Sequence, residues 1–209
     1  MKKFLFLILI TNIIFGCSST KKIVNTNFSK KEVKFIMNAD GLKPMRVYKI
    51  TNLKDSLLLR QKSAYIKPNP NNPVLQNFVN RLYATVRDSM SLGVGIAAPQ
   101  VGILKKIIWV QRFDKENFPF EVYLNPKIIE YSDKKQTFRE GCLSIPNRTD
   151  TLNNRAYSIK IEYDTMKAEH ITEAIKGFTS VIFQHEIDHL NGILYLDHLE
   201  KEVIDAQKK

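Results

Sequence analysis

Residues 184–190, QHEIDHL, place His185, Glu186 and His189 in an H-E-x-x-H pattern. On a helix, positions i and i+4 lie on one face, so the two imidazole rings can bind one metal ion. Glu186, one residue further round, is placed to reach a water molecule beside that ion. Metal-dependent hydrolysis is therefore the leading prediction. Two such histidines also occur as a plain polar pair on an amphipathic helix, so the third ligand decides between the two interpretations.

The third ligand has to come from another part of the chain. Metzincin metalloproteases continue with H-x-x-G-x-x-H, but the position of the last histidine is Tyr195 in this sequence. Downstream, the candidates are Asp197, His198 and Glu200. Upstream, Cys142 offers a thiolate, which binds zinc or ferrous iron strongly and, with two imidazoles, leaves a fourth position open for water. We predict Cys142 as the ligand, against the alternative of a buried free thiol.

A third segment, residues 93–102 (GVGIAAPQVG), precedes a strand-like run. A phosphate-binding loop is disfavoured, because no lysine followed by serine or threonine comes after it and a strand replaces the expected helix. Together with 140–144 (EGCLS) and 184–189 (QHEIDH), this segment resembles, in order and spacing, the three signature motifs of peptide deformylases. The resemblance covers about residues 46–200 and predicts an α+β fold in which antiparallel sheets pack around a metal-bearing central helix.

The resemblance implies an enzyme that removes the formyl group from N-formylmethionyl peptides and releases formate. It implies one divalent metal ion per chain, ferrous iron in this family, with zinc, nickel or cobalt as replacements. One sulfur and two nitrogen atoms would bind the ion, from Cys142, His185 and His189. Glu186 would take a proton from water and deliver it to the departing amine. The alternatives are a broader metal-dependent amidase or peptidase and a non-catalytic metal-binding lipoprotein.

The resemblance also implies contacts to the reacting peptide. The Gln100 side-chain amide and the Leu143 backbone N–H would stabilise the oxyanion. The peptide would lie extended along the backbone of Gly95 and Ile96, as an added strand at a sheet edge. By position, the candidates for the methionine pocket are four apolar residues that are equally well suited to an ordinary core: Phe138, Phe178, Val181 and Ile182.

Metal-bound histidines usually donate their other ring N–H to a carboxylate or a carbonyl group. Glu140 and Asp188 are the carboxylates available for this role. The sequence leaves open which partner each one takes, and a structural role for Glu140 in holding its loop is an equal alternative.

The composition fits one compact domain, and the periodicity predicts its helices and strands. The 209 residues are 44% hydrophobic and 25% charged, near the average for globular chains. Helical spacing is expected over 74–90 and over about 177–191, where the metal motif lies. Strand-like runs are expected at 106–111, 122–125 and 158–163. This order favours helices packed on a largely antiparallel sheet.

The first seventeen residues resemble a bacterial lipoprotein signal. Lys2 and Lys3 precede a short apolar run, and IFGC at 14–17 resembles the site at which a cysteine, here Cys17, is lipidated. The expected division is a signal peptide, a polar tether, a catalytic domain and a charged tail, over residues 1–16, 17–45, 46–200 and 201–209. The protein would be exported and membrane-anchored; an uncleaved anchor helix is the alternative, and without a signal it would be cytoplasmic.

The formal net charge of +11 can attract nucleic acid, anionic lipid or acidic substrates. Because no basic helix, aromatic platform or finger spacing organises this charge, no nucleic-acid partner is predicted. With Cys17 lipidated, Cys142 has no internal disulfide partner and is free for metal. An exported site would oxidise ferrous iron, so zinc or another redox-inert ion is the expected working metal. The sequence does not define the oligomeric state.

Overall fold

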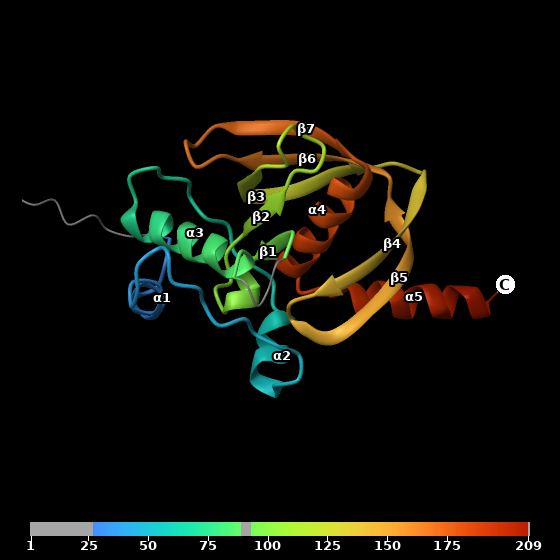
Figure 1. Cartoon of the computed structure of the whole chain (residues 1–209), viewed down its shortest axis with the longest axis horizontal. Coiled ribbons are helices and arrows are strands. Elements are labelled where there is room, and N and C mark those ends of the chain that lie inside the picture. The colour runs from blue at the N-terminus through green and yellow to red at the C-terminus, as the bar shows by residue number, and fades with distance from the viewer. Residues whose placement is uncertain (1–26, 89–92, 209) are drawn as a thin grey trace, which may run out of the picture.

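The computed structural model describes residues 27–88 and 93–208 (Figure 1). The predicted signal peptide, Cys17 and the first part of the predicted tether lie outside these ranges. Within the described ranges, no helix combines the length and the apolar character that a membrane crossing needs.

Two antiparallel sheets form the framework. The larger sheet has the strand order β1-β2-β3-β6-β7, with β1 (Gly95–Ala97) at one edge. Its other strands are β2 (Ile107–Gln111), β3 (Phe120–Tyr131), β6 (Ser158–Asp164) and β7 (His170–Lys176). The smaller sheet is the hairpin of β4 (Lys135–Cys142) and β5 (Ile145–Ala156). The expected strands are thus present, and β3 is longer than its apolar run indicated.

The helix α4 (Gly177–Leu190) lies between the larger sheet and the β4–β5 hairpin (Figure 1). Apolar residues point to several sides of it, and Val181, Phe183 and Ile187 are all buried. A helix that is apolar around most of its circumference belongs inside a protein. The metal motif therefore lies on a central helix, as the sequence predicted.

The remaining helices cover the outside of this framework. They are α1 (Lys30–Ile36), α2 (Leu53–Leu59), α3 (Pro73–Val86), the short 3₁₀ helix η1 (Ala98–Val101) and α5 (Tyr195–Gln207). The start of α3 is fixed by Asn72, whose side chain accepts hydrogen bonds from the backbone N–H groups of Val74 and Leu75. The predicted helix over 74–90 ends earlier, at Val86. The charged tail continues α5 as far as Gln207.

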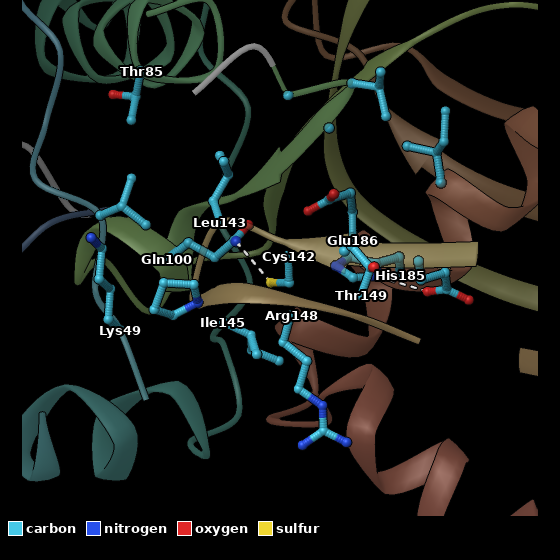
Figure 2. A pocket seen from close by; sticks show the side chains of 18 of the residues that line it. Lys49, Thr85, Gln100, Cys142, Leu143, Ile145, Arg148, Thr149, His185 and Glu186 are labelled. Carbon is cyan, nitrogen blue, oxygen red and sulfur yellow. Dashed lines mark hydrogen bonds and ion pairs between the residues drawn. The ribbon is translucent and has the colours of Figure 1, made fainter. Parts of the chain in front are cut away.

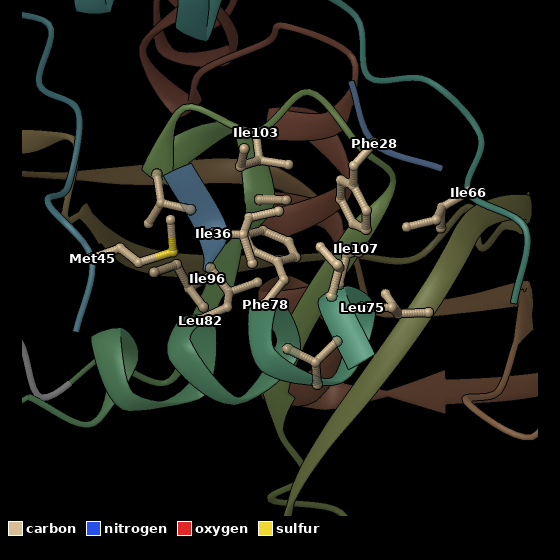
Figure 3. Close-up of a cluster of buried hydrophobic side chains, with 14 of the residues drawn as sticks. Phe28, Ile36, Met45, Ile66, Leu75, Phe78, Leu82, Ile96, Ile103 and Ile107 are labelled. Atoms are coloured by element: carbon tan, nitrogen blue, oxygen red, sulfur yellow. The ribbon is translucent and has the colours of Figure 1, made fainter. Parts of the chain in front are cut away.

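The prediction of a polar tether over 17–45 is wrong for its described part. Residues 27–45 lie against α3, and Phe28, Ile36 and Met45 are buried in the same apolar cluster as Phe78 (Figure 3). The reason is physical: a few apolar side chains in a polar stretch gain enough from burial to order it. The buried guanidinium group of Arg81 also donates hydrogen bonds to three backbone carbonyl groups of this segment, those of Phe35, Ile36 and Lys43.

Candidate metal centre

The structure brings together the three predicted metal ligands. Cys142 is the last residue of β4, while His185 and His189 lie one turn apart on α4. One potential ligand atom from each lies within 4.8 Å of the others, and Cys142 Sγ is 3.2 Å from His189 Nε2. Among the described residues, this is the single group of three or more histidine, cysteine or acidic side chains close enough to share a metal ion.

The surroundings of these atoms fit a bound cation. His185 Nδ1 is 2.8 Å from Glu140 Oε2, which leaves His185 Nε2 as the ligand atom. Glu186 Oε2 is buried without a hydrogen-bond partner. Unpaired buried polar atoms are rare in folded proteins and call for an explanation such as an ion or water. One sulfur and two imidazole nitrogens are a donor set that suits zinc or ferrous iron.

Three pKa shifts follow from the burial of this cluster. Burial raises the pKa of the Cys142 thiol, but His189 and His185 outweigh it and hold that pKa well below its usual value. Burial raises the pKa of Glu186 to about 7. Burial also opposes ionisation of Glu140, yet hydrogen bonds from His185 and Arg155 lower its pKa to about 2. The shifts favour the thiolate form of Cys142 and the anionic form of Glu140. The Glu186 carboxylate beside them binds a proton readily.

The structure answers the question that the sequence left open for the two carboxylates. Glu140 contacts His185 directly and also accepts two hydrogen bonds from Arg155, at 2.7 and 2.9 Å. Asp188 instead accepts from Arg155 and His198, at 2.7 and 2.8 Å. Arg155 thus joins both carboxylates behind the ligand histidine. Sequence reasoning missed Arg155, because an isolated arginine near the end of a strand carries no recognisable motif.

Replacing Arg155 by methionine is expected to lower the free energy of unfolding by about 3–5 kcal/mol, because it leaves buried Glu140 and Asp188 without their cation. Urea denaturation measures this change. The matched control is Arg148→Met on the same strand, because its ion pair with Asp150 is exposed and should contribute little to stability. Equal losses in the two variants would contradict the prediction.

The other candidate ligands near the C-terminus lie away from the cluster. Asp197 forms an ion pair with Arg60, and it also accepts a hydrogen bond from the Leu194 backbone N–H. His198 pairs with Asp188. Glu200 is exposed on α5. None of the three belongs to the group that Cys142 forms with the two histidines.

A cavity of about 1060 Å³ opens above the metal-ligand cluster (Figure 2). The cavity is lined by the predicted metal, acid–base and oxyanion residues Gln100, Cys142, Leu143, His185 and Glu186.

Three of the four predicted methionine-pocket residues also line the cavity: Phe178, Val181 and Ile182. Phe138 stands behind them, stacked on Phe178 with 4.7 Å between the ring centroids. The sequence missed Val94, which also lines the cavity and lies in the loop before β1.

Gln100 has one defined orientation. Its Oε1 atom accepts a hydrogen bond of 2.8 Å from the Ala97 backbone N–H. Its Nε2 group therefore faces Cys142 Sγ at 3.6 Å (Figure 2). It also lies 3.3 Å from Ser144 Oγ. A side-chain amide fixed in this way presents an N–H donor next to the metal-ligand cluster.

The predicted peptide-binding strand lies at a sheet edge. β1 has one neighbour in the larger sheet, β2. The Ile96 side chain is buried in the core, so Ile96 can contact a ligand through its backbone only. Gly95 lies against the Glu186 carboxylate, because a Cβ atom built on it would be 2.5 Å from Glu186 Oε1.

A family model described as polypeptide deformylase matches residues 47–204. The chain belongs to the polypeptide deformylase family. Peptide deformylase 2 of Bacillus subtilis (strain 168) is 42% identical over 113 residues, which cover 53% of this chain and 61% of that relative. The match therefore spans less than two thirds of the B. subtilis protein. Peptide deformylase of Desulforudis audaxviator is 35% identical over 153 residues, which cover 73% of this chain and 94% of that relative.

Solved deformylase structures have the same fold. A class I type b peptide deformylase from Acinetobacter baumannii has a TM-score of 0.66 and 34% identity, covering 74% of this chain and 99% of that chain. The same enzyme with Met-Ala-Ser bound has a TM-score of 0.65 and 33% identity, covering 74% and 98%. These similarities confirm the predicted α+β deformylase fold. The deformylase-like part of this chain is preceded by the segment at 27–45 that packs on α3.

Proposed function

We propose that this chain is a metal-dependent hydrolase that removes the formyl group from N-formylmethionyl peptides and releases formate. One observation carries the proposal. Cys142, His185 and His189 converge at the base of a cavity, next to a buried Glu186 whose Oε2 atom has no partner, in a chain of the deformylase family.

The metal would be held by Cys142, His185 and His189. A divalent ion bound there supplies Lewis acidity: it polarises a carbonyl group and lowers the pKa of water from about 15.7 toward ~7. The donor atoms are contributed by β4 and α4, and Glu140 orients His185 through Nδ1.

Glu186 is assigned the proton transfers. Its unpaired Oε2 accepts a proton as a water oxygen adds to the formyl carbon. When the carbon–nitrogen bond breaks, the same carboxyl group returns the proton to the amine nitrogen, and formate leaves. The burial that raises the pKa of Glu186 to about 7 suits both steps, since the group can bind and release a proton near neutral pH.

Two hydrogen-bond donors are assigned to the developing oxyanion. The Gln100 Nε2 group already faces the cluster, and the Leu143 backbone N–H follows Cys142 directly along the same cavity wall. Donors fixed before the reaction stabilise charge without a reorganisation cost.

The apolar wall of α4 is assigned to the methionine side chain. Phe178, Val181 and Ile182 offer an apolar surface next to the cluster, and Phe138 supports it by stacking on Phe178. Contact between a thioether sulfur and an aromatic ring is favourable, which suits methionine at this position. The peptide backbone would then extend along the free edge of β1.

Replacing Gly95 by alanine is expected to lower kcat/KM for a formyl peptide by about 100-fold. The added Cβ atom would overlap Glu186 Oε1 at 2.5 Å and Ile182 Cγ2 at 2.9 Å, so the carboxylate has to move. Steady-state kinetics check the effect. Gly177→Ala adds a Cβ atom that meets nothing within 4 Å, at a φ of +63°, and so measures the backbone cost of losing a glycine without a steric overlap. Wild-type kcat/KM in Gly95→Ala would contradict the assigned position of Glu186.

The metal-reconstituted full chain, offered formyl-Met-Ala-Ser and acetyl-Met-Ala-Ser, tests the proposed function. Release of formate from the formyl peptide, with the acetyl peptide left intact, is the expected result. Cleavage of the acetyl peptide would instead indicate a broader amidase. No turnover with one equivalent of metal bound would indicate a non-catalytic binding protein and overturn the proposal.

We also propose that the protein is exported and anchored through a lipid on Cys17. Lys2, Lys3 and the apolar run before Cys17 support this proposal. Labelling with a radioactive fatty acid in cells tests it: the wild-type chain should take up label and Cys17→Ser should not. Metal analysis of envelope-derived protein tests the accompanying choice of zinc, and iron as the sole active metal would overturn that choice.

A further inference from the structure

Four basic side chains line the cavity described above, and they are called here the cationic rim: Arg46, Lys49, Arg139 and Arg148. Two of them have carboxylate partners. Arg46 pairs with Asp55 at 2.6 Å, and Arg148 pairs with Asp150 at 2.8 Å. Lys49 and Arg139 form no ion pair with the residues that the structure describes.

Lys49 is held at the cavity by the backbone on both sides of it. The backbone N–H of Tyr48 donates to the Gln100 carbonyl at 2.7 Å, and that of Ile50 donates to the Ser144 carbonyl at 3.0 Å. The segment is therefore fixed against Gln100, one predicted oxyanion donor, and against Ser144, which follows Leu143, the other predicted donor. The Lys49 side chain remains exposed, and in Figure 2 it lies at the periphery of the cavity.

Arg139 lines the cavity from β4. It is on β4, two residues before Gly141, so both residues lie on the same face of the strand and both line the cavity. Its Nε–H donates to Thr149 Oγ1 at 2.9 Å, which fixes the side chain but neutralises no charge. The guanidinium group keeps its positive charge and has further N–H donors on Nη1 and Nη2 for a ligand.

The four basic side chains of the cationic rim outnumber the three carboxylates that line the cavity. Asp88, Glu140 and Glu186 line it, but Glu140 and Glu186 are buried at its base. Glu140 is already paired with Arg155.

The reach of a bound peptide brings its later residues toward the cationic rim. An extended peptide advances roughly 3.3 Å per residue, so the two residues after methionine would lie about 7–10 Å beyond the reacting carbon.

We propose that the cationic rim makes this enzyme prefer formylated peptides that carry negative charge in the two residues after methionine. This proposal rests on the proposed deformylase function. The charge can come from an acidic side chain or from the free C-terminal carboxylate of a short peptide. Lys49 and Arg139 are the residues that determine the preference.

Four peptides test the proposal and distinguish the two sources of charge. Formyl-Met-Ala-Ser-amide is neutral, formyl-Met-Ala-Asp-amide carries an acidic side chain, formyl-Met-Ala-Ser carries a C-terminal carboxylate, and formyl-Met-Ala-Lys-amide is cationic. At low ionic strength, kcat/KM for each anionic peptide is expected to exceed that of the neutral one by about five- to tenfold. The cationic peptide should react more slowly than the neutral one. The differences should shrink in about 0.5 M salt.

Substitutions test whether Lys49 and Arg139 cause the preference for anionic peptides. In Lys49→Ala/Arg139→Ala, the ratio of kcat/KM for the Asp peptide to that for the neutral peptide should fall to about one. Arg139→Glu, which sets one added carboxylate against Lys49, should also lower this ratio to about one. Lys160→Ala/Lys167→Ala is the matched control: both residues are exposed outside the cavity, and the same two charges are lost. An equal fall in the ratio in the control would overturn the proposal.

The two hypotheses fail in different ways. If the neutral peptide is not hydrolysed, the proposed function fails. If it is hydrolysed and all four peptides have equal kcat/KM at low ionic strength, only the cationic rim proposal fails. Calorimetric binding of the deformylated Met-Ala-Asp-amide and Met-Ala-Ser-amide tests the rim without catalysis, and equal affinities would overturn the proposal.

Discussion

Replacing Glu186 by glutamine is expected to lower kcat by about 10²- to 10⁴-fold while the metal content stays near one equivalent. The amide keeps the shape of the buried side chain but cannot accept a proton. Glu186 lies outside the group of three ligand atoms, so its replacement removes no metal donor. Formate release under substrate saturation, together with metal analysis of the same sample, measures both quantities.

Glu200→Gln serves as the matched control, because it makes the same chemical change at an exposed position on α5. It should leave kcat unchanged. A Glu186→Gln protein with near wild-type kcat would show that another group moves the proton, and the acid–base assignment would be abandoned. A variant that lost its metal would instead show that Glu186 holds the ion.

The second large effect is expected for His189→Ala. Removal of one of three protein ligands should lower metal affinity by more than about 100-fold, so that the purified variant retains less than roughly 0.1 equivalent and loses turnover. Metal analysis after dialysis measures the first outcome directly. Since His189 Nδ1 has no hydrogen-bond partner, the replacement breaks few other interactions, and the variant should remain folded.

His170→Ala is the control for this change. His170 is exposed on β7 and pairs with Asp164, away from the metal-ligand cluster. It should retain both metal and activity. Full metal occupancy in the His189→Ala protein would rule out the proposed ligand set, whatever the activity measured.

Much of the site was predictable because its residues are close in sequence or belong to a fixed helical period. The spacing of His185 and His189 defines one helix face, and the central helix that carries them was expected over nearly its observed length. Cys142 was the harder choice. Its selection over Asp197, His198 and Glu200 depended on thiolate chemistry and on the resemblance to the family. The sequence separation of 42 from Gln100 and 47 from His189 gives no local pattern.

Interactions that depend on tertiary packing were not predictable. The burial of Ile36 and Met45 against α3 turned a segment with tether-like composition into part of the core. Arg155 was missed because its importance comes from two carboxylates on other elements. Phe138 was expected at the cavity surface but stacks on Phe178, because the packing of β4 against α4 sets the contact between the two rings.

The packing of Phe28 and Ile36 on α3 has a consequence for how far the folding unit extends. The region matched to the family begins at residue 47, yet the ring of Phe78 is covered from the N-terminal side by Phe28, at 6.0 Å between centroids. A protein truncated at residue 47 would expose this aromatic surface to water and remove Met45 from the cavity wall. We therefore expect the folding unit of this protein to extend N-terminally beyond its homology region.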